Sequence, residues 1–248
     1  MHTSAEDVSL ILDLARVTGG PILEVGCGTG RCLIPIIRKG YDTVGLDSSD
    51  AMLRQLHTKL KREPDEVRYR ATPIQAEGQS FVVPLRFGLA FAAANSFTHY
   101  VRKDQQERFV ENVFHHLRPG GLLIIDVFNP SHRQRSVKGM HRFEVGDFDV
   151  EHEDQITNFA EQTITVRTTV RRQSVTVHNC SWTLRYVFRF ELEHLLEKNG
   201  FEIEEVWGSY DKKPFDDESE RLFVVARKPR DADMTVIRMM QAEALQPA

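Results

Sequence analysis

Three glycines within five residues follow a short apolar run near the start of the chain. The run covers residues 22–25; Gly26, Gly28 and Gly30 come next, and the apolar stretch "CLIPII" continues from there. A glycine turn between a buried strand and a helix brings the backbone close to a ligand and points helix N–H groups at it. A dinucleotide-binding turn needs the spacing G-x-G-x-x-G. Here Arg31 stands at the last position, which disfavours NAD and FAD.

Short apolar runs alternate with helical patterns over the first half of the chain. The predicted strands are residues 21–25, 42–47, 66–72, 87–95 and 122–128. The predicted helices are residues 4–18, 30–40 and 48–62, and a helix within residues 103–121 that Pro119 and the two following glycines stop. Strands that alternate with helices in this way form a parallel sheet covered on both faces. We therefore expect an α/β, Rossmann-like fold.

The pattern changes after Pro130. Residues 143–153, 162–172 and 174–190 show the period-two alternation of antiparallel strands. One face of the last segment carries Trp182, Leu184, Tyr186, Phe188 and Phe190. Such a stripe is more typical of a core than of a substrate pocket.

A helix at residues 191–199 and strands at 201–210 and 220–228 then complete the first pattern. The chain is predicted to form a seven-stranded, mostly parallel sheet with helices on both faces and an inserted antiparallel β-meander. The predicted domains are a core of residues 1–130 and 190–229, an inserted substrate or lid subdomain of residues 131–189, and a tail helix of residues 230–248.

Composition excludes several classes of protein. The net charge of −4 argues against a dedicated nucleic-acid binder. No apolar run approaches the ~18 residues of a membrane span, and the N-terminus lacks the features of a signal peptide. Cys27, Cys32 and Cys180 do not have the spacing of metal ligands. We therefore expect no bound metal and a cytoplasmic location.

Four stretches carry a resemblance to a known family: "ILEVGCGTGR", "VGLDSSDAML", "NSFTHY" and "HLRPGGLLIIDVFNP". Together they resemble class I S-adenosylmethionine-dependent methyltransferases, and specifically the small-molecule branch with an inserted β-meander, which includes sugar and glycine-type N-methyltransferases. The resemblance covers residues 4–228. It departs from the family at residues 76–78, "AEG", where the family usually has an aspartate in a "GDM"-like triplet. It also lacks the tyrosine-containing N-terminal segment of many relatives.

The resemblance implies S-adenosyl-L-methionine as the cofactor, bound at the carboxyl ends of the strands. Gly26 and Gly28 would let the backbone approach the ribose and the methionyl group. Asp47, about 20 residues past the glycine turn, would accept hydrogen bonds from the two ribose hydroxyls. The complete set of candidate cofactor-binding residues is Glu24, Gly26, Cys27, Gly28, Gly30, Asp47, Ser48, Met52, Ala76, Glu77 and Asn95.

Several of these residues also have a simpler interpretation. Glu24 could cap the following helix, Asp47 could be a helix-start acid, and Met52 could belong to the core instead of packing against adenine. Glu77 could be a solvated loop acid, and Cys27 most often fills a tight turn.

Methyl transfer requires in-line positioning, desolvation and, for a protonated acceptor, one base. His99 and Tyr100 are the catalytic candidates, because they follow the fourth strand. His99 could equally be a surface residue at a helix start. Weaker options for the base are His132, His141, His152 and Tyr186.

Three other classes of protein compete with this interpretation. An oxidoreductase shares the fold, but its turn has a different spacing. A nucleic-acid methyltransferase would show a basic patch or an Asn/Asp-Pro-Pro-aromatic loop where this chain has "NSFTHY". The third possibility, a protein that binds the cofactor without transferring its methyl group, is left open by the sequence. We expect an N- or O-methyltransferase of a small-molecule acceptor, with no nucleic-acid or membrane partner, and we also consider a homodimer.

Overall fold

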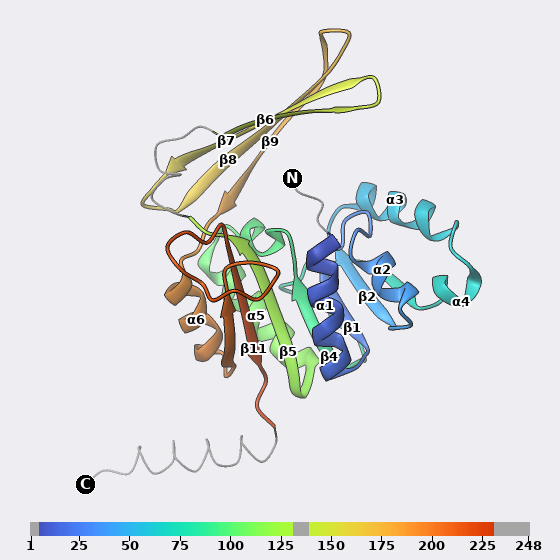
Figure 1. Cartoon of the computed structure of the whole chain (residues 1–248), viewed down its shortest axis with the longest axis vertical. Coiled ribbons are helices and arrows are strands. Elements are labelled where there is room, and N and C mark those ends of the chain that lie inside the picture. Colours follow the sequence, from blue (N-terminus) through green and yellow to red (C-terminus); the bar gives the residue numbers. More distant parts are fainter. Residues whose placement is uncertain (1–4, 131–138, 231–248) are drawn as a thin grey trace.

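The computed structural model describes residues 5–130 and 139–230. One sheet contains β1 (Ile22–Val25), β2 (Thr43–Asp47), β3 (Ala71–Gln75), β4 (Phe87–Ala92), β5 (Leu117–Phe128), β10 (Glu202–Trp207) and β11 (Arg221–Arg227). These seven strands lie in the order β10-β11-β5-β4-β1-β2-β3. All neighbours are parallel except β11, which is antiparallel to both β5 and β10. The predicted seven-stranded, mostly parallel sheet is confirmed (Figure 1).

Helices cover both faces of this sheet. They are α1 (Ala5–Thr18), α2 (Leu33–Arg38), α3 (Asp50–Leu60), α4 (Asp65–Arg68), α5 (Lys103–His116) and α6 (Arg189–Lys198), with a short 3-10 helix, η1 (Ser96–His99). Strand residues alternate between two apolar cores. Leu23 faces the core that α5 and α6 close, whereas Ile22 faces the core that α1 and α2 close. This alternation is how one short buried strand supports two layers of helices.

The third strand is displaced from its predicted position. Residues 66–72 were expected to be extended, but residues 65–68 form α4 and β3 begins at Ala71. Pro64 is the N-cap of this helix, and Asp65 and Glu66 occupy its first turn. Acidic side chains are stabilising at a helix N-terminus, where the free N–H groups carry partial positive charge. This local effect outweighs the β propensity of the valine and tyrosine that follow.

The boundary between α5 and β5 also differs from the prediction. The helix ends at His116, close to the predicted stop at Pro119, but the strand begins at Leu117 and not at Leu122 as expected. Pro119 disfavours helical backbone at the residue before it. Gly120 then donates its N–H to the Lys228 carbonyl at 2.8 Å, which continues the sheet.

A second sheet contains β6 (Gly139–Val145), β7 (Phe148–Asn158), β8 (Thr163–Arg172) and β9 (Val175–Arg185), all antiparallel and in sequence order. The predicted meander is therefore confirmed. It follows β5 in the chain and lies beyond the carboxyl end of the parallel strands (Figure 1). None of the helices within residues 5–130 and 139–230 is long and apolar enough to cross a membrane.

The predicted aromatic stripe of the meander is broken. Leu184 and Tyr186 are buried, as expected of core residues. The strand ends at Arg185, however, so Phe188 becomes the N-cap of α6 and Phe190 lies in that helix with 64% of its surface exposed. The change from a strand to a helix removes the common face. The predicted tail helix begins at Arg230, and its remaining residues lie outside the described part of the chain.

Candidate functional site

The glycine turn joins β1 to α2 and is tied to β2. Gly26 and Cys27 both donate their backbone N–H to the Leu46 carbonyl, at 2.8 and 2.9 Å. Gly28 has a φ of +52°, in the left-handed region, and a Cβ built there would meet no atom of the described residues within 4 Å. A Cβ on Gly26 would lie 2.5 Å from Ser96 Oγ. Gly28 is therefore the glycine that borders open space, whereas Gly26 permits close packing.

Asp47, at the end of β2, lies directly beside this turn. Its Oδ2 accepts the Gly28 N–H at 2.7 Å, and its Oδ1 accepts the Ser49 N–H at 2.9 Å. Ser49 in turn caps α3 by accepting the N–H of Met52. A carboxylate has about four lone-pair positions, so two remain for a ligand. The close approach of Asp47 to the glycine turn agrees with the expected arrangement.

Glu24 is buried below the turn. Only 4% of it is exposed, and its Oε2 has no hydrogen-bond partner among the described residues. Burial raises the pKa of Glu24 to about 8, while the nearby Arg31 opposes the rise and Asp7 adds to it. Arg31 forms an ion pair with the buried Asp7 of α1. Arg31, which departs from the dinucleotide pattern, thus links the first helix to the turn.

The remaining cofactor candidates border the same edge of the sheet. Ala76 donates its N–H to the Asp47 carbonyl at 3.1 Å, which places the "AEG" segment beside the end of β2. Glu77 and Ser48 are exposed. Met52 is 44% exposed, so it does not belong to the core. Cys27 is buried, and burial raises the pKa of its thiol, in keeping with a residue that fills a tight turn.

The loop after β4 approaches the glycine turn from the other side. Asn95 was expected to present its backbone to a ligand. Instead, its N–H donates to the Asp126 carbonyl at 3.0 Å, and its own carbonyl accepts the Thr98 hydroxyl at 2.7 Å. The preceding Ala94 is exposed and also has a positive φ, of 50°. Ala94 is a residue that the sequence analysis missed, because nothing in an alanine indicates an unusual backbone.

The two catalytic candidates have different surroundings. Tyr100 lies in the core, with its ring centroid 5.0 Å from that of Phe109, and burial raises the pKa of its hydroxyl. His99 is exposed at the end of η1, which contacts β9. Desolvation by the surrounding protein lowers the pKa of His99, and the Asp47 carboxylate opposes that shift. The geometry favours His99 over Tyr100 as a base.

The weaker base candidates are dispersed. His132 lies outside the described residues, and only the backbone of His141, in β6, is described. His152 Nδ1 lies 2.6 Å from the Thr168 hydroxyl within the second sheet. Tyr186 is buried beside α6.

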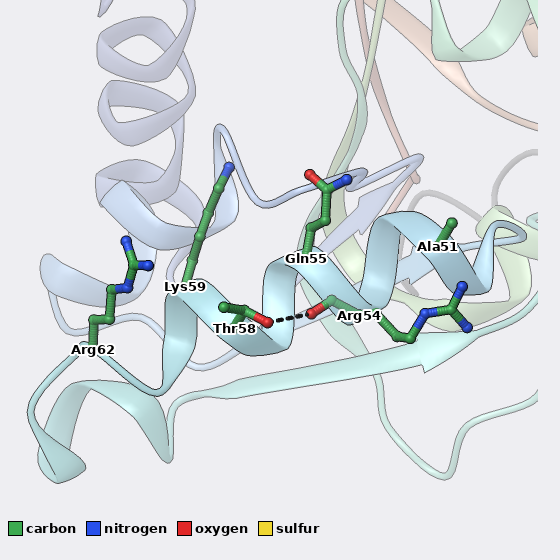
Figure 2. Close-up of a pocket in the computed structure, with 6 residues that line it drawn as sticks. All are labelled: Ala51, Arg54, Gln55, Thr58, Lys59 and Arg62. Carbon is green, nitrogen blue, oxygen red and sulfur yellow. Dashed lines mark hydrogen bonds between the residues drawn. The ribbon is translucent and has the colours of Figure 1, made fainter. Parts of the chain in front are cut away.

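A surface hollow of about 470 Å³ lies elsewhere, on the outer side of α3. Figure 2 shows the residues that line it: Ala51, Arg54, Gln55, Thr58, Lys59 and Arg62. Arg54 pairs with Asp50, and Lys59 Nζ donates to the Thr29 carbonyl at 3.0 Å. None of the candidate site residues lines this hollow.

Comparison with known proteins agrees with the geometry. Residues 22–121 match the family model of a methyltransferase domain. Glycine N-methyltransferase of Rattus norvegicus is 31% identical over 133 residues, which cover 50% of this chain and 45% of that protein. A dTDP-3-amino-3,4,6-trideoxy-alpha-D-glucopyranose N,N-dimethyltransferase of Streptomyces venezuelae is 30% identical over 125 residues, or 49% of each chain. The chain thus spans about half the length of the curated relatives it matches.

A solved structure resembles nearly the whole chain. The CcbJ methyltransferase from Streptomyces caelestis has a TM-score of 0.80 at 23% identity, covering 91% of this chain and 90% of that one. Residues 22–121 therefore match a methyltransferase domain, and the chain has the same fold as the CcbJ methyltransferase.

Proposed function

We propose that this chain transfers the methyl group of S-adenosyl-L-methionine to a nitrogen or oxygen of a small molecule. The observation that carries the proposal is the pair formed by Asp47 and Gly28. A carboxylate with free lone pairs lies 2.7 Å from the N–H of the glycine that borders open space. Two vicinal ribose hydroxyls need such an acceptor, and the methyltransferase domain over residues 22–121 supports the same assignment.

The residues around this pair fit the rest of the cofactor. Glu24 is buried near Arg31 and Asp7, and its Oε2 has no partner in the part of the chain that the structure describes; a cationic ligand there would stabilise its ionised form. Met52 and the "AEG" segment lie beside Asp47, where they would border the adenine. When bound, the cofactor supplies an already activated methyl group, so the protein has to position the acceptor and exclude water.

His99 is the residue we assign to proton removal from the acceptor. The lowered pKa keeps its imidazole neutral at pH 7, and a neutral imidazole can accept a proton. We place the acceptor between η1 and the second sheet, whose strand β9 contacts η1. The glycine and amino-sugar methyltransferases among the relatives both act on nitrogen by name, which supports an amine as the acceptor. A cytoplasmic location and a homodimer stay predictions.

A thermal-shift experiment tests the cofactor. S-adenosylhomocysteine and S-adenosylmethionine, each at micromolar concentration, should raise the Tm of the full chain, because a ligand that binds only the folded state stabilises it by mass action. NAD and FAD should leave the Tm unchanged. Asp47→Ala should weaken binding of S-adenosylhomocysteine by about 1.5–3 kcal/mol, the scale of hydrogen bonds to a charged group. Stabilisation by NAD alone would contradict the proposal.

Removal of β6, β7, β8 and the first half of β9 tests the acceptor side. A short Gly-Ser linker in place of residues 139–180 should preserve binding of S-adenosylhomocysteine, because Asp47 and the glycine turn belong to the other sheet. Methyl transfer from radiolabelled S-adenosylmethionine to an acceptor library should be lost. If the shortened chain methylates the acceptors of the full chain at the full rate, the second sheet is no part of the acceptor site.

A further inference from the structure

Two consecutive residues of the loop after β4 adopt a conformation that side chains disfavour. Ala94 and Asn95 have φ values of 50° and 69°, both in the left-handed region. Residues other than glycine are uncommon there and persist only where the surrounding structure holds them. The contacts that hold this loop therefore decide the shape of the site's edge.

Asp126 is the first of these contacts. It lies near the carboxyl end of β5 and is only 1% exposed. Its Oδ2 accepts the Ala94 N–H at 2.9 Å, and its backbone carbonyl accepts the Asn95 N–H at 3.0 Å. The Asn95 side chain reaches back to the same strand, where its Oδ1 accepts the Phe128 N–H at 2.8 Å. Both residues with positive φ are thus hydrogen-bonded to β5.

Arg221, the first residue of β11, contacts both Asp126 and Asn95. Its Nε donates to Asp126 Oδ1 at 2.6 Å, and its terminal nitrogen donates to Asn95 Oδ1 at 3.3 Å. Burial raises the pKa of Asp126, and the Arg221 charge opposes that rise. The guanidinium also lies over the ring of Tyr210, 5.7 Å from its centroid. The side chain is 21% exposed, so solvent competes little for these contacts.

This loop forms part of the candidate cofactor site. Ser96 stands so close to Gly26 that a Cβ on that glycine would lie 2.5 Å from its hydroxyl oxygen. The next residues form η1, which ends at His99. A shift of the loop would therefore move both the wall beside the glycine turn and the candidate base.

We propose that Arg221 is a positioning residue, which holds residues 94–99 in the geometry that binds the cofactor by joining Asp126 to Asn95. The inference rests on the proposed function. It assigns a role in the site to β11, which is distant in sequence from both the glycine turn and the loop after β4.

The test compares two arginines of the same strand. Arg221→Met removes the charge and the donors while keeping an unbranched side chain. Arg227→Met is the matched control, since Arg227 also forms an ion pair, with Glu204, and donates to the Gly120 carbonyl at 2.6 Å, but at the opposite end of β11. Arg221→Lys retains the charge and serves as the conservative variant. The measurements are the Kd of S-adenosylhomocysteine by calorimetry and the Tm, both on the full chain.

We expect Arg221→Met to weaken binding at least tenfold and Arg227→Met less than twofold. Arg221→Lys should recover part of the affinity. Hydrogen exchange of the Ala94 and Asn95 amides should speed up in Arg221→Met alone. Equal affinity of the two methionine variants, with wild-type binding intact, overturns this inference only. A wild-type chain that does not bind S-adenosylhomocysteine overturns the proposed function as well.

Discussion

Replacing Gly28 with valine is expected to abolish binding of S-adenosylhomocysteine while the chain stays folded. The N–H of Gly28 meets the Asp47 carboxylate, and the space beside its Cα is open to a ligand. A branched side chain would fill that space. Binding measured by calorimetry should fall below detection.

Valine at Gly28 will lower the stability of the fold, because the φ of this residue is positive. The control substitution must therefore also replace a glycine with positive φ. Gly40, after α2, has a φ of +91° and also has open space at its Cβ position, but it lies away from Asp47. Gly40→Val should therefore lower the Tm by a comparable amount and leave the affinity unchanged. Gly30→Val, by contrast, would overlap Leu56 of α3 and should unfold the turn. Unaltered affinity in folded Gly28→Val would show that the ligand binds elsewhere.

Raising the pH from 5 to 8 is expected to lower the stability of the ligand-free chain through Glu24. Burial raises the pKa of this carboxyl from its ordinary value of 4.5 to about 8. Between these values the unfolded chain releases the proton and the folded chain retains it, so stability falls as pH rises. At 1.36 kcal/mol for each unit of pKa difference, the loss is on the order of 3 kcal/mol. Urea unfolding at pH 5, 6, 7 and 8 measures it.

Glu24→Gln should remove this part of the pH dependence and make the ligand-free chain more stable at pH 8. Glu66→Gln, the same chemical change at an exposed position on α4, should leave the pH profile as it is. Glu24→Gln should also weaken binding of the cationic cofactor at least tenfold. Parallel stability curves for wild type and Glu24→Gln between pH 5 and 8 would mean that Glu24 is ionised in the folded chain.

The sequence identifies the parts of the fold that depend on neighbouring residues. The apolar run at residues 22–25 forms the expected strand, and the glycines after it form the expected turn. The errors occur where two local preferences compete. At residues 65–68 a helix start overrides β propensity, and the segment around the expected helix stop at Pro119 already belongs to β5, which begins at Leu117.

The site divides in the same way. Asp47 and the glycine turn are predictable, because the length of one strand-helix-strand unit brings them together. Asp7, Asp126 and Arg221 escape prediction, although Asp126 is a charged residue inside an apolar run, "LLIIDVF". Arg221 lies 126 residues from the asparagine it contacts. Nothing local indicates that pairing.

What the sequence determines by itself is thus the α/β class, the inserted meander, the type of turn and the acid opposite it, since each depends on periodicity or spacing within about 30 residues, the size of one strand-helix-strand unit. Only the tertiary structure decides that β11 enters antiparallel beside β5, and that its first arginine reaches the loop after β4. It also decides that Glu24 is buried and that one of its oxygens has no partner within residues 5–130 and 139–230. Burial and long-range ion pairs are properties of the packed sheet, because strands that are distant in sequence become neighbours only when the whole sheet forms.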